Sequence, residues 1–292
     1  MRVTKWKGWN WWILPACILC LIISIIPWLI MIYNSFFNLS YAKPRSGAFV
    51  GLENYRHIFN DDAMWQSFVV TLKFVAISLP AEFILGLIFA IILVRHQRLR
   101  KIVVPIIIIP MVISPSVVGL LWQLNLNPSF GPLGIFFRSI GLFREGLLGT
   151  ADTALYTLIA IDIWQWTPFM FLLFVAGLLG QAKEPLEAAA VDGASSWQTF
   201  WHVTVPALKP IFIVGVLLRF TDVYKIFDTP WIMTGGGPGL ATETLSIIGY
   251  RVNFKFWHIG YGAAIVTVIF LISYLVSLIF TKVVMPPERK ID

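Results

Sequence analysis

Charge is what this sequence has least of. Asp, Glu, Lys and Arg make up 13% of its 292 residues, whereas 58% are hydrophobic. An average soluble domain is about 25% charged and about 45–50% apolar. So few charges cannot cover a water-facing surface of this size, which excludes a soluble globular protein and makes membrane lipid the expected solvent. The net charge of +7 comes from basic residues in short segments between apolar runs. This placement indicates membrane topology, and we expect no nucleic-acid partner.

The residues of common catalytic and metal sites are also missing. The only cysteines, Cys17 and Cys20, lie inside the first apolar run, and no other Cys or nearby His completes a metal or redox site. The sequence contains no G-x-S-x-G and no H-E-x-x-H, and no G-x-x-x-x-G-K-[ST] that would hold ATP. We therefore expect no catalytic residue and no metal, and the chain is not predicted to be an enzyme.

Long apolar runs are abundant. A helix needs roughly 20 apolar residues to cross the hydrocarbon of a bilayer. Six runs approach or exceed this length, at about 12–33, 67–94, 102–123, 154–180, 207–229 and 262–285. The first run is too long for a cleaved signal segment and lacks a small-residue cleavage site. The sequence predicts an all-α integral membrane protein in which residues 1–292 form a single transmembrane domain of about six helices.

Proline interrupts the predicted spans at several points. Pro105, Pro110 and Pro115 all fall in the third run, and Pro80 falls in the second. In lipid, the carbonyls that proline frees must be satisfied by neighbouring helices or by water. This favours a packed bundle with an internal cavity over a simple membrane anchor.

The distribution of Lys and Arg predicts the orientation. With the N-terminus inside, the inside segments and adjoining helix ends hold twelve Lys or Arg, and the longer outside loops hold seven. The clearest inside loop is 95–101, which contains four of them. Because positive residues favour the cytoplasmic side, we expect a multi-pass protein with both termini in the cytoplasm.

A short amphipathic hairpin is predicted over residues 184–206, between the fourth and fifth runs. Its first helix should end at Asp192-Gly193, and Ser195 with Gln198 forms a possible capping box for a second helix. Trp197, Phe200 and Trp201 are spaced to share one face of that helix, and Pro206 should end it. The pattern fits a helix on the membrane surface and a lever that docks into a partner protein equally well.

The same segment resembles a known motif. Glu187-Ala188-Ala189, then Gly193, and finally Val203, Val205 and Pro206 resemble the EAA loop of permeases in binding-protein-dependent ABC importers. The two valines stand where the motif usually has Ile and Leu. Further stretches resemble the carbohydrate uptake family, in its compact six-helix MalF-like or UgpA-like form: 49–55, 192–194, 233–239, 242–244 and 260–264.

The resemblance implies a type I ABC importer permease in a bacterial inner membrane. Its partners would be a second homologous permease, two ATP-binding subunits and an extracytoplasmic solute-binding protein. ATP and Mg would be bound by the ATPase partner, with no cofactor in this chain. The solute would be a sugar, a polyol or a glycerol phosphate, and the sequence does not say which. The residues implied in coupling to the ATPase are Glu187, Ala188, Ala189, Asp192, Gly193, Trp197, Phe200 and Trp201.

Charged residues in the fifth run are candidates for the solute path. Arg219, Asp222, Lys225 and Asp228 follow one another at steps of three, a spacing that lets opposite charges pair along a helix face. Arg219 would lie near the middle of the bilayer, where charge is costly and usually faces a bundle interior or a wet cavity. The alternative is a purely structural ion ladder that grips the partner permease.

The fourth run adds polar and aromatic candidates. Asp162, Gln165 and Trp166 share one helix face, and such a face could pair sugar hydroxyls and stack on the apolar side of the ring. Helix packing is the alternative explanation for all three. Gln123, in the third run, is a weaker path candidate, and Glu82 in the second run is interpreted as structural.

A different class of transporter would also fit the predicted membrane helices. An ion-gradient-driven secondary transporter or channel would need no ATPase. Such proteins have no general need for the amphipathic hairpin at 184–206, which therefore speaks against them.

Overall fold

The computed structural model describes residues 10–43, 47–94, 96–143 and 145–284. The basic residues predicted inside at 1–9, at Arg95 and at 285–292 lie outside the described residues. The chain divides into two compact units, one formed by Met1–Asp61 with Gly249–Leu271 and the other by Asp62–Ile248 with Ile272–Asp292.

The first unit joins the two ends of the chain. It contains α1 (Asn10–Ser35), a small antiparallel hairpin of β1 (Phe37–Asn38) and β2 (Ala48–Phe49), and α2 (Glu53–Phe59). From the other end come the π-helix η2 (Arg251–Lys255) and the start of α13 (Ile259–Val284). α12 (Leu245–Tyr250) leads into η2 from the second unit.

Close backbone contact holds the start of α13 against the segment after α1. The Gly260 N–H donates to the Leu39 carbonyl at 2.8 Å, and any Cβ at Gly260 would collide with the Phe37 carbonyl oxygen. The Tyr261 hydroxyl also lies 2.5 Å from an Asp61 carboxylate oxygen. Position 260 therefore requires glycine.

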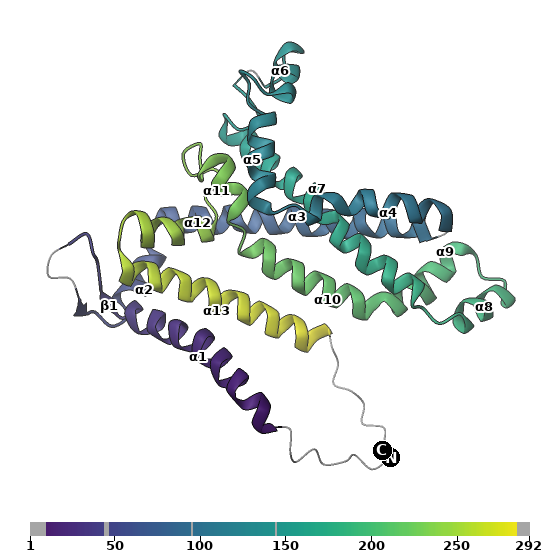
Figure 1. The fold of residues 1–292 in the computed structure, drawn as a ribbon, viewed down its shortest axis with the longest axis horizontal. Coiled ribbons are helices and arrows are strands. Elements are labelled where there is room, and N and C mark those ends of the chain that lie inside the picture. The colour runs from purple at the N-terminus through teal and green to yellow at the C-terminus, as the bar shows by residue number, and fades with distance from the viewer. Residues whose placement is uncertain (1–9, 44–46, 95, 144, 285–292) are drawn as a thin grey trace. The chain divides into compact units, whose positions relative to one another are not determined.

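The second unit is built on α3 (Asp62–Val94), α7 (Ala151–Leu179) and α10 (Val205–Tyr224). α3 packs along α7, and α10 packs against both (Figure 1). Six of the ten buried residues of α3 recur every four positions, so they form one ridge on the helix surface. Its members are Val70, Phe74, Ser78, Glu82, Gly86 and Ala90. At Gly86 a Cβ would lie 2.7 Å from the Cβ of Met170, so glycine lets the two helices touch.

The third apolar run is broken rather than kinked. α4 (Gln97–Val112) and α5 (Pro115–Asn125) meet at an angle of 91°. Pro115 starts α5 and has no N–H to continue the preceding helix, which explains the break. The Gln165 side chain on α7 donates to the freed Ile113 carbonyl at 3.1 Å. A neighbouring helix thus satisfies a carbonyl at the proline break, as expected in lipid. α6 (Pro132–Ser139) follows α5.

The number of candidate spans agrees with the sequence. In the described residues five helices are long and apolar enough to cross a membrane, or six if the bent pair α4 and α5 is one span. The 18-residue apolar stretch of α1, all of it described, contains no buried residue, as expected of a helix that faces lipid. The fold is thus the predicted mostly helical membrane fold.

The hairpin after α7 begins as predicted and ends differently. α8 (Glu184–Val191) is followed by α9 (Ser196–Thr199), the π-helix η1 (Phe200–Thr204) and then α10 without interruption. The prediction that Pro206 ends the second helix is therefore wrong. The Val205 N–H donates five residues back to the Phe200 carbonyl, and this wider turn accommodates Pro206 in the first turn of α10.

The fifth predicted span contains a break near its C-terminal end, although the candidate span as a whole runs from Ser196 to Thr234. α10 stops at Tyr224, and after a break of three residues α11 (Asp228–Thr234) begins. α11 packs against α5, and it ends at Gly235, whose φ of 61° is left-handed. Broken helices from two parts of the chain therefore lie side by side.

Candidate functional site

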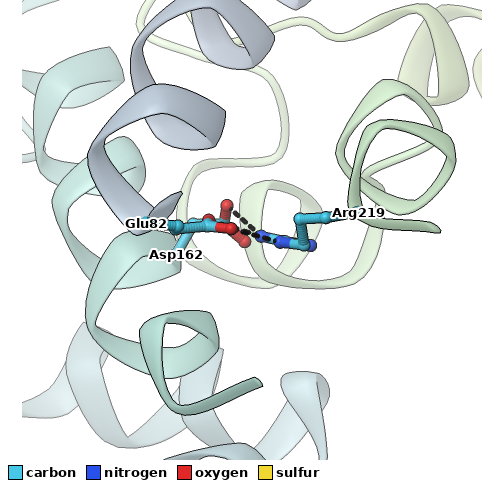
Figure 2. A network of polar contacts seen from close by, with 3 residues as sticks. All are labelled: Glu82, Asp162 and Arg219. Atoms are coloured by element: carbon cyan, nitrogen blue, oxygen red, sulfur yellow. Dashed lines mark hydrogen bonds and ion pairs between the residues drawn. The ribbon is translucent and has the colours of Figure 1, made fainter. Parts of the chain in front are cut away.

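Three buried charged residues meet between the main helices of the second unit. Arg219 of α10 donates from Nε to Glu82 of α3 at 2.6 Å and from Nη2 to the other oxygen of Glu82 at 2.8 Å. The same Nη2 lies 2.5 Å from an Asp162 oxygen on α7. Figure 2 shows the guanidinium of Arg219 pointing towards the two carboxylates, which lie close together. We call these three residues the charged triad.

Burial makes the triad energetically demanding. Its side chains expose 2% (Arg219), 0% (Glu82) and 3% (Asp162) of their surface. Charges at such sites are tolerated only where partners and hydrogen bonds compensate the lost hydration. The planar guanidinium meets this demand because it can bind one carboxylate with two parallel hydrogen bonds. Since each residue comes from a different helix, the triad fixes α3, α7 and α10 to one another.

The alternative interpretation, an ion ladder along the fifth span, does not form within this chain. Arg219 pairs across helices with Glu82 and Asp162, and Asp222 lies exposed three residues later. Lys225 and Asp228 lie beyond the end of α10, so they cannot continue its face. An exposed pair within one helix contributes about 0.2–0.5 kcal/mol, whereas a buried arginine without a carboxylate costs several kcal/mol. Pairing of Arg219 with carboxylates on other helices is therefore more favourable than pairing along α10.

A cavity of about 340 Å³ opens beside the triad. The indole of Trp166 lies 4.9 Å from the guanidinium carbon of Arg219, a cation–π contact. The breaks between α4 and α5 and between α10 and α11 supply much of the remaining wall. The lining residues are Pro115, Asp162, Trp166, Arg219, Asp222, Lys225, Ile226, Phe227, Asp228 and Thr229.

The structure brings together five of the seven predicted path residues. Asp162, Trp166, Arg219, Asp222 and Lys225 all line the cavity. The other two lie elsewhere. Gln165 is buried and bonds the Ile113 carbonyl, and Gln123 donates to the Met233 carbonyl at 3.3 Å. In the structure both glutamines satisfy backbone carbonyls near helix breaks.

Sequence reasoning missed the partner role of Glu82. The signal was present, because Glu82 is the only acidic residue in the apolar run 67–94. A lone carboxylate at that depth requires a cation, and Arg219 is the matching lone arginine of the fifth run. The separation of 137 residues between them kept the pair out of reach of local patterns.

The hairpin at 184–206 has the predicted local geometry. α8 ends at Val191 with Asp192 as its C-cap, and Gly193 adopts a left-handed φ of 73°. The Ser195 N–H donates to the Gln198 side chain at 2.8 Å, and the Gln198 N–H donates to the Ser195 hydroxyl at 3.3 Å. This is the predicted capping box, and it starts α9 directly after the turn.

The outer surface of the hairpin is uncovered. No residue of α8, all of which is described, is buried, and Glu187, Ala188 and Asp192 are exposed. Ala189 is half-buried. Such an accessible stretch of small and acidic residues leaves room for a partner.

The aromatic residues of the hairpin form one cluster. The ring centroids of Trp197 and Trp201 lie 5.6 Å apart, and those of Phe200 and Trp201 lie 5.3 Å apart. Trp197 exposes 69% and Trp201 exposes 49% of its surface. Exposed aromatic area of this size is typical of surfaces that bind a partner or a membrane.

Comparison with known proteins decides the family. The model of the "Binding-protein-dependent transport system inner membrane component" family matches residues 82–289. The chain belongs to this family. It is a permease of the carbohydrate-uptake type, a multi-pass inner membrane protein whose ATPase is a separate subunit, so the ion-gradient-driven alternative is wrong.

Two relatives and one solved structure illustrate the match. The permease is 35% identical to the trehalose/maltose transport system permease protein MalF of Thermococcus litoralis, over 80% of this chain and 79% of that protein. It is 30% identical to the sulfoquinovosyl glycerol transport system permease protein SmoG of Agrobacterium fabrum, over 92% and 88%. A bacterial alginate ABC transporter, crystallised with an alginate pentasaccharide-bound periplasmic protein, contains a chain of the same fold. The two chains superpose with a TM-score of 0.79 at 20% sequence identity, and the match covers 93% of the permease and 92% of that chain.

Removing the guanidinium from the triad should destabilise the permease strongly. Arg219→Met leaves Glu82 and Asp162 buried without a cation, which should cost about 3–5 kcal/mol. Adding Glu82→Gln and Asp162→Asn removes the unpaired charges and should recover most of the loss. Thermal unfolding of the purified complex measures both effects. Equal stability of Arg219→Met and the wild type, or a triple variant weaker than the single one, would contradict this role.

Proposed function

We propose that this permease forms half of the translocation path of an ATP-driven importer for a sugar-like solute. A second homologous permease supplies the other half, and two ATP-binding subunits drive transport from the cytoplasm. A solute-binding protein outside the cytoplasm delivers the solute. We propose no cofactor in this chain, because ATP and Mg bind to the ATPase subunits.

The cavity beside the charged triad is the observation that carries the solute proposal. It combines carboxylates, basic groups and the indole of Trp166 within about 340 Å³. Small-molecule sites in proteins typically begin at about this volume. A sugar needs paired donors and acceptors for its hydroxyls and an aromatic surface for its apolar face, and the lining offers both. The relative from Thermococcus litoralis is a trehalose/maltose transport permease, which supports the same solute class.

We propose the hairpin as the element that couples the permease to an ATPase subunit. Glu187, Ala188, Asp192 and Trp197 are exposed, so the surface is free for docking. Beyond it the helix continues through η1 into α10 without a loop. From Trp197 to Arg219 this rod is roughly 33 Å long at 1.5 Å per residue. Movement of the docked hairpin would therefore reach the charged triad directly.

The Gly193 turn allows a sharp test of coupling. A Cβ at Gly193 meets no atom within 4 Å, so only its φ of 73° resists substitution. Gly193→Val should misplace the hairpin, because a β-branched residue strongly resists a positive φ. We expect loss of the co-purifying ATPase or of solute-stimulated ATP hydrolysis, with normal membrane insertion. Gly193→Asn is the matched control, because Asn tolerates this conformation, and should retain most activity. Normal values for the Val variant would refute the coupling role.

Trp166 tests whether the cavity lies on the solute path. Trp166→Ala removes the stacking surface and should lower uptake about tenfold or more, since burial of such a side chain contributes about 1.5–3 kcal/mol. Trp166→Phe keeps an aromatic face and should keep most of the uptake. Uptake of radiolabelled solute into cells, normalised to assembled complex, gives the result. Unchanged uptake in the Ala variant would remove the cavity from the path.

We also propose an orientation of the permease in the membrane. The excess of Lys and Arg on one side places both termini in the cytoplasm. A reporter that is active only outside the cytoplasmic membrane, fused after Asp292, should be silent, and one fused within the loop 124–153 should be active. The opposite pattern would invert the topology and place the hairpin on the wrong side for an ATPase.

A further inference from the structure

The charges around the cavity beside the triad do not balance. Its lining contains three carboxylates, from Asp162, Asp222 and Asp228, and two basic groups, from Arg219 and Lys225. Glu82 lies directly behind Arg219 and adds a fourth carboxylate to the same group. The fixed charge facing a solute is therefore negative.

Arg219 is poorly placed to reverse this sign. Its Nε and Nη2 atoms already donate to Glu82 and Asp162 at 2.5–2.8 Å, and its side chain is 2% exposed. The two carboxylates together outweigh its single positive charge. An anionic group that enters the cavity would meet a guanidinium that is almost fully buried and whose charge is already compensated by two carboxylates.

Lys225 is the other cation, and its surroundings are negative too. It follows directly after the last residue of α10, so it lies at the negative end of that helix dipole. Asp222 and Asp228 lie three residues before and after it and line the same cavity. The Ser116 hydroxyl donates to Asp228 at 3.4 Å, which is a long contact that leaves this carboxylate with most of its acceptor capacity.

We propose that this cavity selects uncharged or positively charged solutes and rejects acidic ones. Within the proposed function, on which this inference rests, the solute is then a neutral sugar, a polyol or an amino sugar. Sugars that carry a carboxylate, sulfonate or phosphate are excluded. Sugar hydroxyls can donate to the surplus carboxylate oxygens, whereas an anion offers no donor there and meets like charge.

A cysteine placed in the cavity measures this potential without knowledge of the solute. Cys17 and Cys20, both exposed and the only cysteines of the chain, are first replaced by serine. Ile226→Cys then puts a single thiol on the cavity wall. The purified complex is treated with methanethiosulfonate reagents of similar size that carry a trimethylammonium group, a sulfonate or no charge. Ser129→Cys, on an exposed loop, is the reference thiol.

The rate ratio of the cationic to the anionic reagent is the result. We expect this ratio at Ile226→Cys to exceed the ratio at Ser129→Cys by roughly tenfold or more, the lower bound for a charged cleft. Adding Asp222→Asn or Asp228→Asn should lower the ratio towards the reference, and Lys225→Gln should raise it. A ratio equal to or below the reference, or one insensitive to both Asn substitutions, would overturn the proposal.

A second readout separates this inference from the proposed function. Modification of Ile226→Cys by the uncharged reagent should block uptake, because it fills the cavity. If the ratio is high and uptake persists, the cavity is not on the path, and the proposed path and solute selection both fail. If uptake is blocked but the ratio is at the reference, the path stands and only the selection is overturned.

Discussion

The architecture of the second unit depends on one constraint: a guanidinium placed where water is excluded must be surrounded by acceptors. Glu82 and Asp162 meet this constraint from two different helices, so the pairing also sets how α3, α7 and α10 pack. The ridge of buried residues on α3 passes through Glu82, and Gly86 lies one turn further along it. Close helix contact and charge compensation therefore occur on the same face of α3, and neither can change without the other.

Broken helices provide the space beside that constraint. The third span turns by 91° before Pro115, which starts a short helix, and residues 225–227 separate α10 from α11. Backbone groups exposed by such breaks are tolerable only with substitute partners. Gln165 performs this task for the Ile113 carbonyl at the break before Pro115, and Gln123 bonds the Met233 carbonyl in the last turn of α11. Gln165 of α7 thus supports broken backbone, whereas Asp162 and Trp166 of the same helix line the cavity.

The sequence predicted best what depends on neighbours in the chain. The apolar runs, the helix stop at Gly193 and the capping box of Ser195 with Gln198 are local features, and the structure contains all of them. Features that depend on distant residues were missed or misassigned. The spacing of the charges in the fifth run suggests only partners on the same helix, whereas the carboxylates that Arg219 contacts are 137 and 57 residues away. The predicted helix end at Pro206 was wrong for another reason, since the π-helical turn η1 lets the helix continue past this proline.

The unbroken path from α9 through η1 to α10 has a consequence for how such permeases can diverge. A continuous helix transmits rotation as well as displacement, so a rotation at one end turns the side chains at the other end by the same angle. Inserting or deleting a single residue within 200–204 would turn everything beyond it by about 100°. Arg219 would then point away from Glu82 and Asp162, although no residue near the triad had changed. Length in this short segment is therefore under tighter control than side-chain identity, and a hairpin grafted from another permease must match it in residue count.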